Sequence, residues 1–261
     1  MISFTTAQAN AWIAAFIFPS ARILAFIATA PLLSNTAIPR RVRLLLGIAL
    51  VVAIVPSVPP IPTVIPTSGQ GILILLQQML IGIGMGFSMR LVFAGIEMAG
   101  DLIGSQMGLG FATLYDPMSA SQTMVISNFL SLLTTLIFLS LNGHLVYFAT
   151  LAESFRAIPI ASTPIIGNAF SVLFLQGQKI FMIGVLLSLP IITALLITNL
   201  ALGVLNRASP QLNLFAVGFP ITILMGFWGI ALILPNMIRP IEHLFDEGLQ
   251  GILLFTLATL K

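Results

Sequence analysis

Long apolar stretches that are almost free of charge dominate this amino-acid sequence. Six of them follow one another along the 261 residues: 11–33, 42–58, 71–94, 124–148, 168–205 and 211–238. Only 7% of the residues are charged, whereas an average soluble protein has about 25%. Seven acidic and ten basic residues cannot cover the surface of a soluble fold of this size. The sequence therefore predicts an integral membrane protein, or a subunit buried among equally apolar partners.

The lengths of these stretches do not match a regular series of membrane spans. A spanning helix needs about 20 residues. Stretch 42–58 is marginal, because prolines end it from position 56 onward. Stretch 168–205 is too long, since as one helix it would measure about 57 Å against a hydrocarbon core of about 30 Å. Hydropathy alone thus leaves open which stretches cross lipid.

Helix boundary signals predict an all-α fold built from helical hairpins. Asp116-Pro117 and Ser209-Pro210 each place an N-cap oxygen before a proline at the first helical position. Asn206 is a predicted C-cap, so Asn206, Arg207 and Ser209 are expected in a tight turn. Residues 168–238 then form a helical hairpin, and 240–260 form a further amphipathic helix.

Basic residues predict the orientation in the membrane. Arg40, Arg41 and Arg43 form the one basic cluster, which is typical of a cytoplasmic anchor beside anionic lipid. Alternation of the stretches then places the turn at Arg207 on the cytoplasmic side as well. The net charge of +3 is too small and too scattered for a nucleic-acid partner.

The sequence predicts no catalytic, cofactor or metal site. Gly82, Gly84 and Gly86 do not have the spacing of a dinucleotide-binding loop, and no P-loop is present. The only histidines, His144 and His243, have neither metal-ligand spacing nor a triad pattern. An intramembrane enzyme that uses one of them is therefore the weakest of the alternatives.

Glycines spaced four residues apart predict close helix packing. Small residues at this spacing let helix backbones approach each other. The positions concerned are Gly82, Gly86, Gly100 and Gly104.

Three charged residues share one predicted helical stripe at i, i+7 and i+11: Arg90, Glu97 and Asp101. Ionisable groups in an apolar segment indicate function. One hypothesis is a secondary transporter or ion channel that uses Glu97 and Asp101. The other, which is favoured because no further membrane-embedded acid continues a relay, has them facing water or a neighbouring subunit.

Segment 106–117 combines bulky apolar residues with glycines before a helix start. Gly108 and Gly110 loosen the backbone, and Asp116 caps the next helix. The bulky residues are Met107, Leu109, Phe111, Leu114 and Tyr115. Composition fits equally well a stopper in a channel and an ordinary packed loop.

Five spaced blocks carry a family resemblance along nearly the whole chain. They are LSNTAIPRRVR from Leu33, QQMLIGIGMG from Gln77, QMGLGFATLYDP from Gln106, LNGHL from Leu141 and LALGVLNRASPQLNLFAVGFP from Leu200. With these blocks in this order, the chain resembles the FliR family of flagellar biosynthetic proteins, which are subunits of the type III protein export gate.

The resemblance implies a non-enzymatic subunit of a helical assembly in the bacterial inner membrane, at the flagellar basal body. Its partners would be FliP and FliQ, together with FlhB, FlhA and membrane lipid, and unfolded flagellar proteins would pass through. Residues 1–167 would be similar to FliP, and 168–261 to the FliQ hairpin with a C-terminal amphipathic helix. Residues 106–116 would be the pore plug. Several apolar stretches would then be buried against other subunits instead of lipid.

Overall fold

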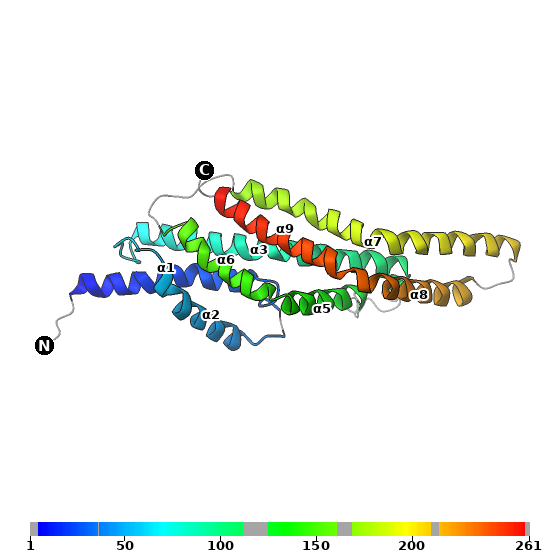
Figure 1. Cartoon of the computed structure of the whole chain (residues 1–261), viewed down its shortest axis with the longest axis horizontal. Helices are drawn as coiled ribbons and strands as arrows, with labels where there is room; N and C mark the ends of the chain where they lie inside the picture. The colour runs from blue at the N-terminus through cyan, green and yellow to red at the C-terminus, as the bar shows by residue number, and fades with distance from the viewer. Residues whose placement is uncertain (1–4, 36, 112–124, 161–168, 210–213, 259–261) are drawn as a thin grey trace. The chain divides into compact units, whose positions relative to one another are not determined.

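The computed structural model describes all residues except 1–4, 36, 112–124, 161–168, 210–213 and 259–261. The described residues form helices and no strand (Figure 1), which confirms the all-α prediction. They divide into two compact units that are interleaved along the chain. Unit 1 comprises Met1–Leu91, Asn142–Gly177 and Phe245–Lys261, and unit 2 comprises Val92–Leu141 and Gln178–Leu244.

Unit 1 is built around α1 and the first part of α3, and unit 2 around the second part of α3. The elements of unit 1 are α1 (Thr6–Thr29), α2 (Arg40–Ile54), η1 (Val55–Ser57), the start of α3 (Gly69–Gln106) and α6 (Gly143–Ala157), with the start of α7 (Ala169–Ala208) and the end of α9 (Ile238–Ala258). Unit 2 holds the end of α3, η2 (Leu109–Phe111), α5 (Val125–Ser140), most of α7, α8 (Leu214–Ile233), η4 (Leu234–Asn236) and the start of α9.

Four described helices are long and apolar enough to cross a membrane: Gln8–Thr29, Gly69–Gln106, Ser171–Ala208 and Val217–Asn236. A fifth span exists if α5 and α6 count as one broken span. Helix α2 is not among them, because its 15 residues extend only about 22 Å. The six apolar stretches are therefore not six equal spans, as the irregular lengths had indicated.

Helix α3 extends as the charged stripe requires, whereas the end of α7 differs from the predicted one. Helix α3 runs past the apolar stretch that ended at residue 94 and includes Glu97 and Asp101. A helix needs backbone hydrogen bonds and not apolar side chains, and both acids are exposed. Helix α7 runs to Ala208, so the prediction that Asn206 ends it was wrong. Pro210 disfavours the helical conformation at Ser209, and this is the stronger stop signal.

A buried arginine holds unit 1 together. Arg22 of α1 is completely buried. Its Nε donates to Oε1 of Gln78 on α3 at 2.8 Å. Its Nη1 donates to the Ser154 carbonyl and its Nη2 to the Ile158 carbonyl, each at 2.9 Å. The guanidinium also lies 4.3 Å from the centre of the Phe155 ring.

These contacts place a positive charge at the C-terminal end of α6. The last carbonyl groups of α6 lack helical partners, and the helix dipole makes that end negative. Arg22 donates to the Ile158 carbonyl and contributes the opposite charge, and it adds a second donor to the Ser154 carbonyl, which already accepts the Ile158 N–H. Three helices, α1, α3 and α6, are thereby fixed to one side chain.

We expect Arg22→Met to destabilise the protein far more than Arg156→Met. The first change takes the Arg22 donor from two buried acceptors, Gln78 Oε1 and the Ile158 carbonyl, at about 1–3 kcal/mol each. The second removes only an exposed pair with Glu153, at 3.4 Å, and such pairs contribute about 0–1 kcal/mol. Denaturant unfolding of both purified variants in detergent measures the difference. Equal losses of unfolding free energy would contradict the role assigned to Arg22.

Candidate functional site

The end of α3 is the candidate site that the described residues define best. Beyond Gln106, the N–H of Met107 donates to the Ile103 carbonyl at 2.9 Å, and the N–H of Gly108 donates to the Ser105 carbonyl at 3.0 Å. Gly108 has φ 87°, the left-handed conformation that commonly ends a helix and that glycine adopts without strain. Residues Leu109–Phe111 then form a single 3₁₀ turn. The sequence thus makes a helix stop at Gly108.

Met107 lies in the core of unit 2. Its side chain is completely buried, and Thr222 of α8 directs its Oγ1 to the Met107 carbonyl at 3.2 Å. Gly226 of α8 lies against the Met107 side chain, so a Cβ there would stand 2.7 Å from Met107 Cε. Of the other predicted plug residues, Leu109 is half-buried and Gly110 is exposed. Leu114, Tyr115 and Asp116 lie outside the described residues.

The predicted packing glycines meet their neighbours at different distances. A Cβ at Gly82 would overlap the Arg22 carbonyl of α1, and one at Gly86 would stand 2.8 Å from the Phe26 carbonyl oxygen. A Cβ at Gly100 would stand 2.6 Å from the Ser127 nitrogen of α5. At Gly104 the nearest atom is at 3.7 Å, which is ordinary van der Waals contact.

The charged stripe lies exposed on α3. Arg90, Glu97 and Asp101 all face away from the core. Glu97 contacts α5, since its carbonyl accepts from Ser127 Oγ at 2.9 Å and its Oε1 accepts from Ser131 Oγ at 3.0 Å. In the described part of the chain, no group of three or more His, Asp or Glu side chains gathers as a metal site would require.

The predicted cytoplasmic turn is partly helical. Asn206 and Arg207 belong to the last turn of α7, and both are exposed, as is Ser209 directly after the helix. A cation in the last turn complements the negative end of the helix dipole. The next residues, 210–213, lie outside the described residues.

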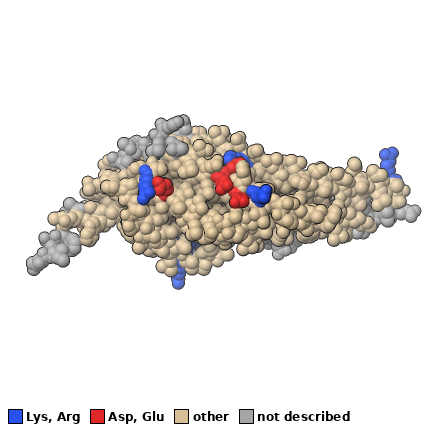
Figure 2. Space-filling model, in the orientation of Figure 1, with Lys and Arg blue, Asp and Glu red and all other residues tan. Residues whose placement is uncertain are grey.

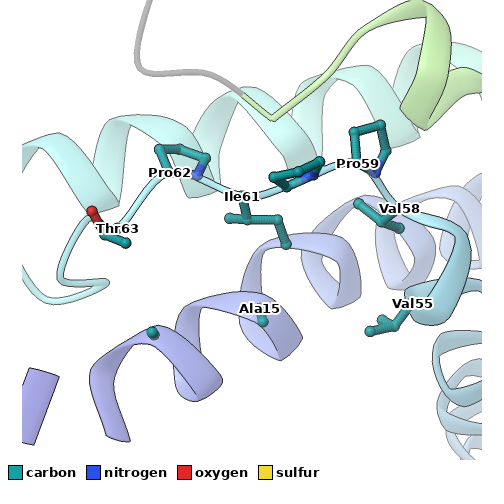
Figure 3. Close-up of a pocket in the computed structure, with 9 residues that line it drawn as sticks. Ala15, Val55, Val58, Pro59, Ile61, Pro62 and Thr63 are labelled. Carbon is teal, nitrogen blue, oxygen red and sulfur yellow. The ribbon is translucent and has the colours of Figure 1, made fainter. Parts of the chain in front are cut away.

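Unit 1 also contains a cavity of about 210 Å³ between α1 and the proline-rich segment after η1 (Figure 3). Its lining is apolar apart from Thr63. Ligand sites normally add several convergent polar groups to such a lining, to orient the ligand. The cavity therefore lacks the means to position a polar substrate.

Comparison with known proteins decides the family. The family described as bacterial export proteins, family 1, matches residues 13–248. The chain is 46% identical over 247 residues to the flagellar biosynthetic protein FliR of Pectobacterium carotovorum, covering 95% of this chain and 94% of that protein. It is 42% identical over 249 residues to FliR of Escherichia coli K12, with the same coverage. FliR of Bacillus subtilis is 30% identical over 217 residues, covering 82% and 83% of the two chains. The chain belongs to the FliR family of bacterial export proteins.

The FliR-family match extends over both compact units. It includes the end of α3 and the part of α8 that holds Met107. The family resemblance predicted from the five sequence blocks is thus confirmed.

Two residues of this site, Thr222 and Gly226, were not predicted. With Gly218 they form a run of small residues four apart, which is the signal that selected the glycines of α3. The same rule applied to α8 would have found them.

We expect Gly100→Ala to destabilise the protein and Gly104→Ala to be tolerated. The added methyl at position 100 meets the backbone of α5, which cannot move aside as a flexible side chain can. Overpacking of this kind costs about 1–3 kcal/mol. Thermal unfolding of the two variants in detergent compares one change at two positions of one helix. If both variants unfold at the same temperature, close approach at Gly100 is not what fixes α3 to α5.

Proposed function

We propose that this chain is a structural, non-enzymatic subunit of the flagellar type III protein export gate. In this role it helps to form the conduit through which unfolded flagellar proteins cross the bacterial inner membrane. The observation that carries the proposal is the 46% identity to a flagellar biosynthetic protein FliR over 95% of the chain. The transporter or ion-channel alternative through Glu97 and Asp101 gains no support from these relatives.

Helix length and exposure support an assembly with other subunits. At 38 and 40 residues, α3 and α7 measure about 57 and 60 Å, nearly twice the hydrocarbon thickness of about 30 Å. Within the protein, 28% of an 18-residue apolar window in the span Ser171–Ala208 is buried, and 22% of such a window in the span Val217–Asn236. Figure 2 shows charged side chains on this face in a few small patches, with uncharged residues between them. Apolar surface that extends beyond the lipid needs protein to cover it, and the partners proposed are FliP and FliQ, with FlhB and FlhA.

The proposed division into residues 1–167, similar to FliP, and 168–261, similar to FliQ, has other bounds than the two compact units. The compact units are interleaved along the chain, because α3, α7 and α9 each contribute to both. A FliQ-like part that folds back onto a FliP-like part is compatible with such interleaving.

Residues 106–116 are the proposed plug of the conduit. A pore wide enough for a polypeptide would also pass ions, and a hydrophobic constriction that excludes water can prevent this. Gly108 and Gly110 permit the backbone to rearrange. Since Met107 is buried in the core of unit 2, its role in the plug is to anchor it, and the residues that seal begin at Leu109.

A purification tests the proposed function directly. A tagged copy of the chain, extracted in mild detergent, should bring down a large complex that contains FliP and FliQ. A lone monomer that carries ions in vesicles would instead support the transporter hypothesis. Export of flagellin into the medium should be lost when the chain is absent and restored by the tagged copy.

Deletion of residues 110–115 tests the plug. We expect the complex to assemble in normal yield and the cells to leak potassium, because the constriction is gone while the helices remain. A valinomycin-treated strain calibrates the efflux. If the deletion variant assembles fully and the membrane stays as tight as with the parent chain, the segment is ordinary packing.

A cysteine at Ala208 tests the proposed orientation. The chain has no Cys, so Ala208→Cys gives a single thiol on an exposed position beside Arg207. The positive-inside rule places it in the cytoplasm. An impermeant thiol reagent should label it in inverted membranes and leave it unlabelled in intact spheroplasts. The opposite pattern would reverse the topology.

A further inference from the structure

Helix α2 carries three arginines at its start and no acidic residue in its first turn. Arg40 and Arg41 are exposed, and neither forms an ion pair within the described part of the chain. Arg43 differs from them, because it is half-buried and its Nη2 donates to the Asn35 carbonyl at 2.9 Å. The structure thus divides the basic cluster into one arginine that is used within the protein and two that lack a countercharge among the described residues.

One side of α2 packs against α1 (Figure 1). Gly47 lets the two helices approach closely, since a Cβ there would stand 2.5 Å from Leu24 Cδ2 and 3.4 Å from Ile27 Cδ1. Val51 and Ile54, one and two turns further along, are buried on the same side. This side of α2 is therefore occupied by the protein itself.

The other side of α2 is exposed and apolar. Leu45, Ile48 and Val52 follow Arg41 at i+4, i+7 and i+11, so the four residues form one stripe along the helix. The three apolar side chains are between 50% and 67% exposed. From Arg41 to Val52 the helix axis extends about 16 Å, which is close to half of a hydrocarbon core of about 30 Å. The stripe thus has a cation at one end and the length of one lipid leaflet.

An anionic phospholipid has the chemistry that this stripe requires. The forked N–H donors of arginine match the oxygens of a phosphate group. A free phosphate would use only the arginines and would leave the apolar side chains in water. A phospholipid covers these side chains with an acyl chain as well, and anionic lipids attract basic residues at the cytoplasmic surface.

We propose that the exposed side of α2 is a binding site for an anionic phospholipid of the cytoplasmic leaflet. Arg40 and Arg41 bind its phosphate, and its acyl chain lies against Leu45, Ile48 and Val52. This rests on the membrane location in the proposed function. It adds to the predicted cytoplasmic anchor a place for the acyl chain, and it excludes Arg43 from the headgroup site.

A photoreactive lipid tests the site in the full chain. The gate complex is purified and reconstituted in phosphatidylcholine vesicles that contain a small fraction of phosphatidylglycerol with a photoreactive acyl chain. Peptide mass spectrometry after illumination locates the adducts. We expect adducts within residues 44–52 of this chain, and far fewer when phosphatidylcholine carries the same photoreactive acyl chain.

Substitution of the two arginines measures their contribution. Each basic residue beside an anionic lipid surface favours binding by about fivefold. We expect Arg41→Gln to lower the yield of these adducts about fivefold, and Arg40→Gln with Arg41→Gln to lower it about 25-fold. The matched control is Arg156→Gln, which removes an exposed arginine of α6 that pairs with Glu153 at 3.4 Å. It should leave the adduct yield unchanged.

The other possible occupants give different results. If excess inorganic phosphate abolishes the adducts, the arginines form a simple anion site and the lipid assignment is overturned. If the double variant keeps the parent's adduct yield but no longer purifies with FliP and FliQ, α2 is a protein interface and the lipid assignment is overturned as well. The proposed function is tested separately, since absence of FliP and FliQ from the parent complex would contradict the export gate and not the lipid site.

Discussion

The length of α3 and α7 determines how much apolar helix surface lies outside the hydrocarbon core and has to be covered by protein. Each helix is nearly twice as long as the hydrocarbon core is thick, at about 57 and 60 Å against about 30 Å. A helix in lipid can tilt, but tilts average about 20° and gain little length. The remaining apolar surface needs protein around it. The proposed export-gate assembly would supply that protein, and the 7% content of charged residues is compatible with it.

Close contacts between helices follow from the same condition. Apolar side chains gain little from leaving lipid, so helices associate through fit and polar contacts. In unit 2, Gly95 of α3 receives Ile183 of α7, and Gly184 of α7 receives Met98 of α3. In unit 1, Arg22 joins three helices through uncharged acceptors and an aromatic ring, and Gln176 of α7 donates to the Gly251 carbonyl of α9 at 2.9 Å. Both kinds of contact, close fit and buried hydrogen bonds, thus hold the helices of this chain.

The sequence predicted the helical class and the family, because hydropathy and block order are local properties. The spacing of Arg90, Glu97 and Asp101 predicted one helical stripe, and α3 does include all three residues, because a helix needs only backbone hydrogen bonds to continue past exposed charges. The contacts of Arg22 were not predicted, because its partners lie 56 to 136 residues away in the sequence. Met107 was predicted as a bulky apolar residue of the plug. The sequence did not show that its side chain packs against Gly226 and is completely buried.

A plug in a protein conduit has two conflicting requirements. It must be loose enough to make way for a polypeptide and must return to one position to exclude ions. A segment that is flexible along its whole length meets the first requirement and fails the second, since ordering its backbone costs about 1–2 kcal/mol per residue at each return. A segment that is rigid throughout fails the first. At the end of α3, buried Met107 is held against α8, and Gly108 with its left-handed φ lets the backbone turn away directly after it. A plug at residues 106–116, as proposed above, would thereby be fixed at one end by the core of unit 2.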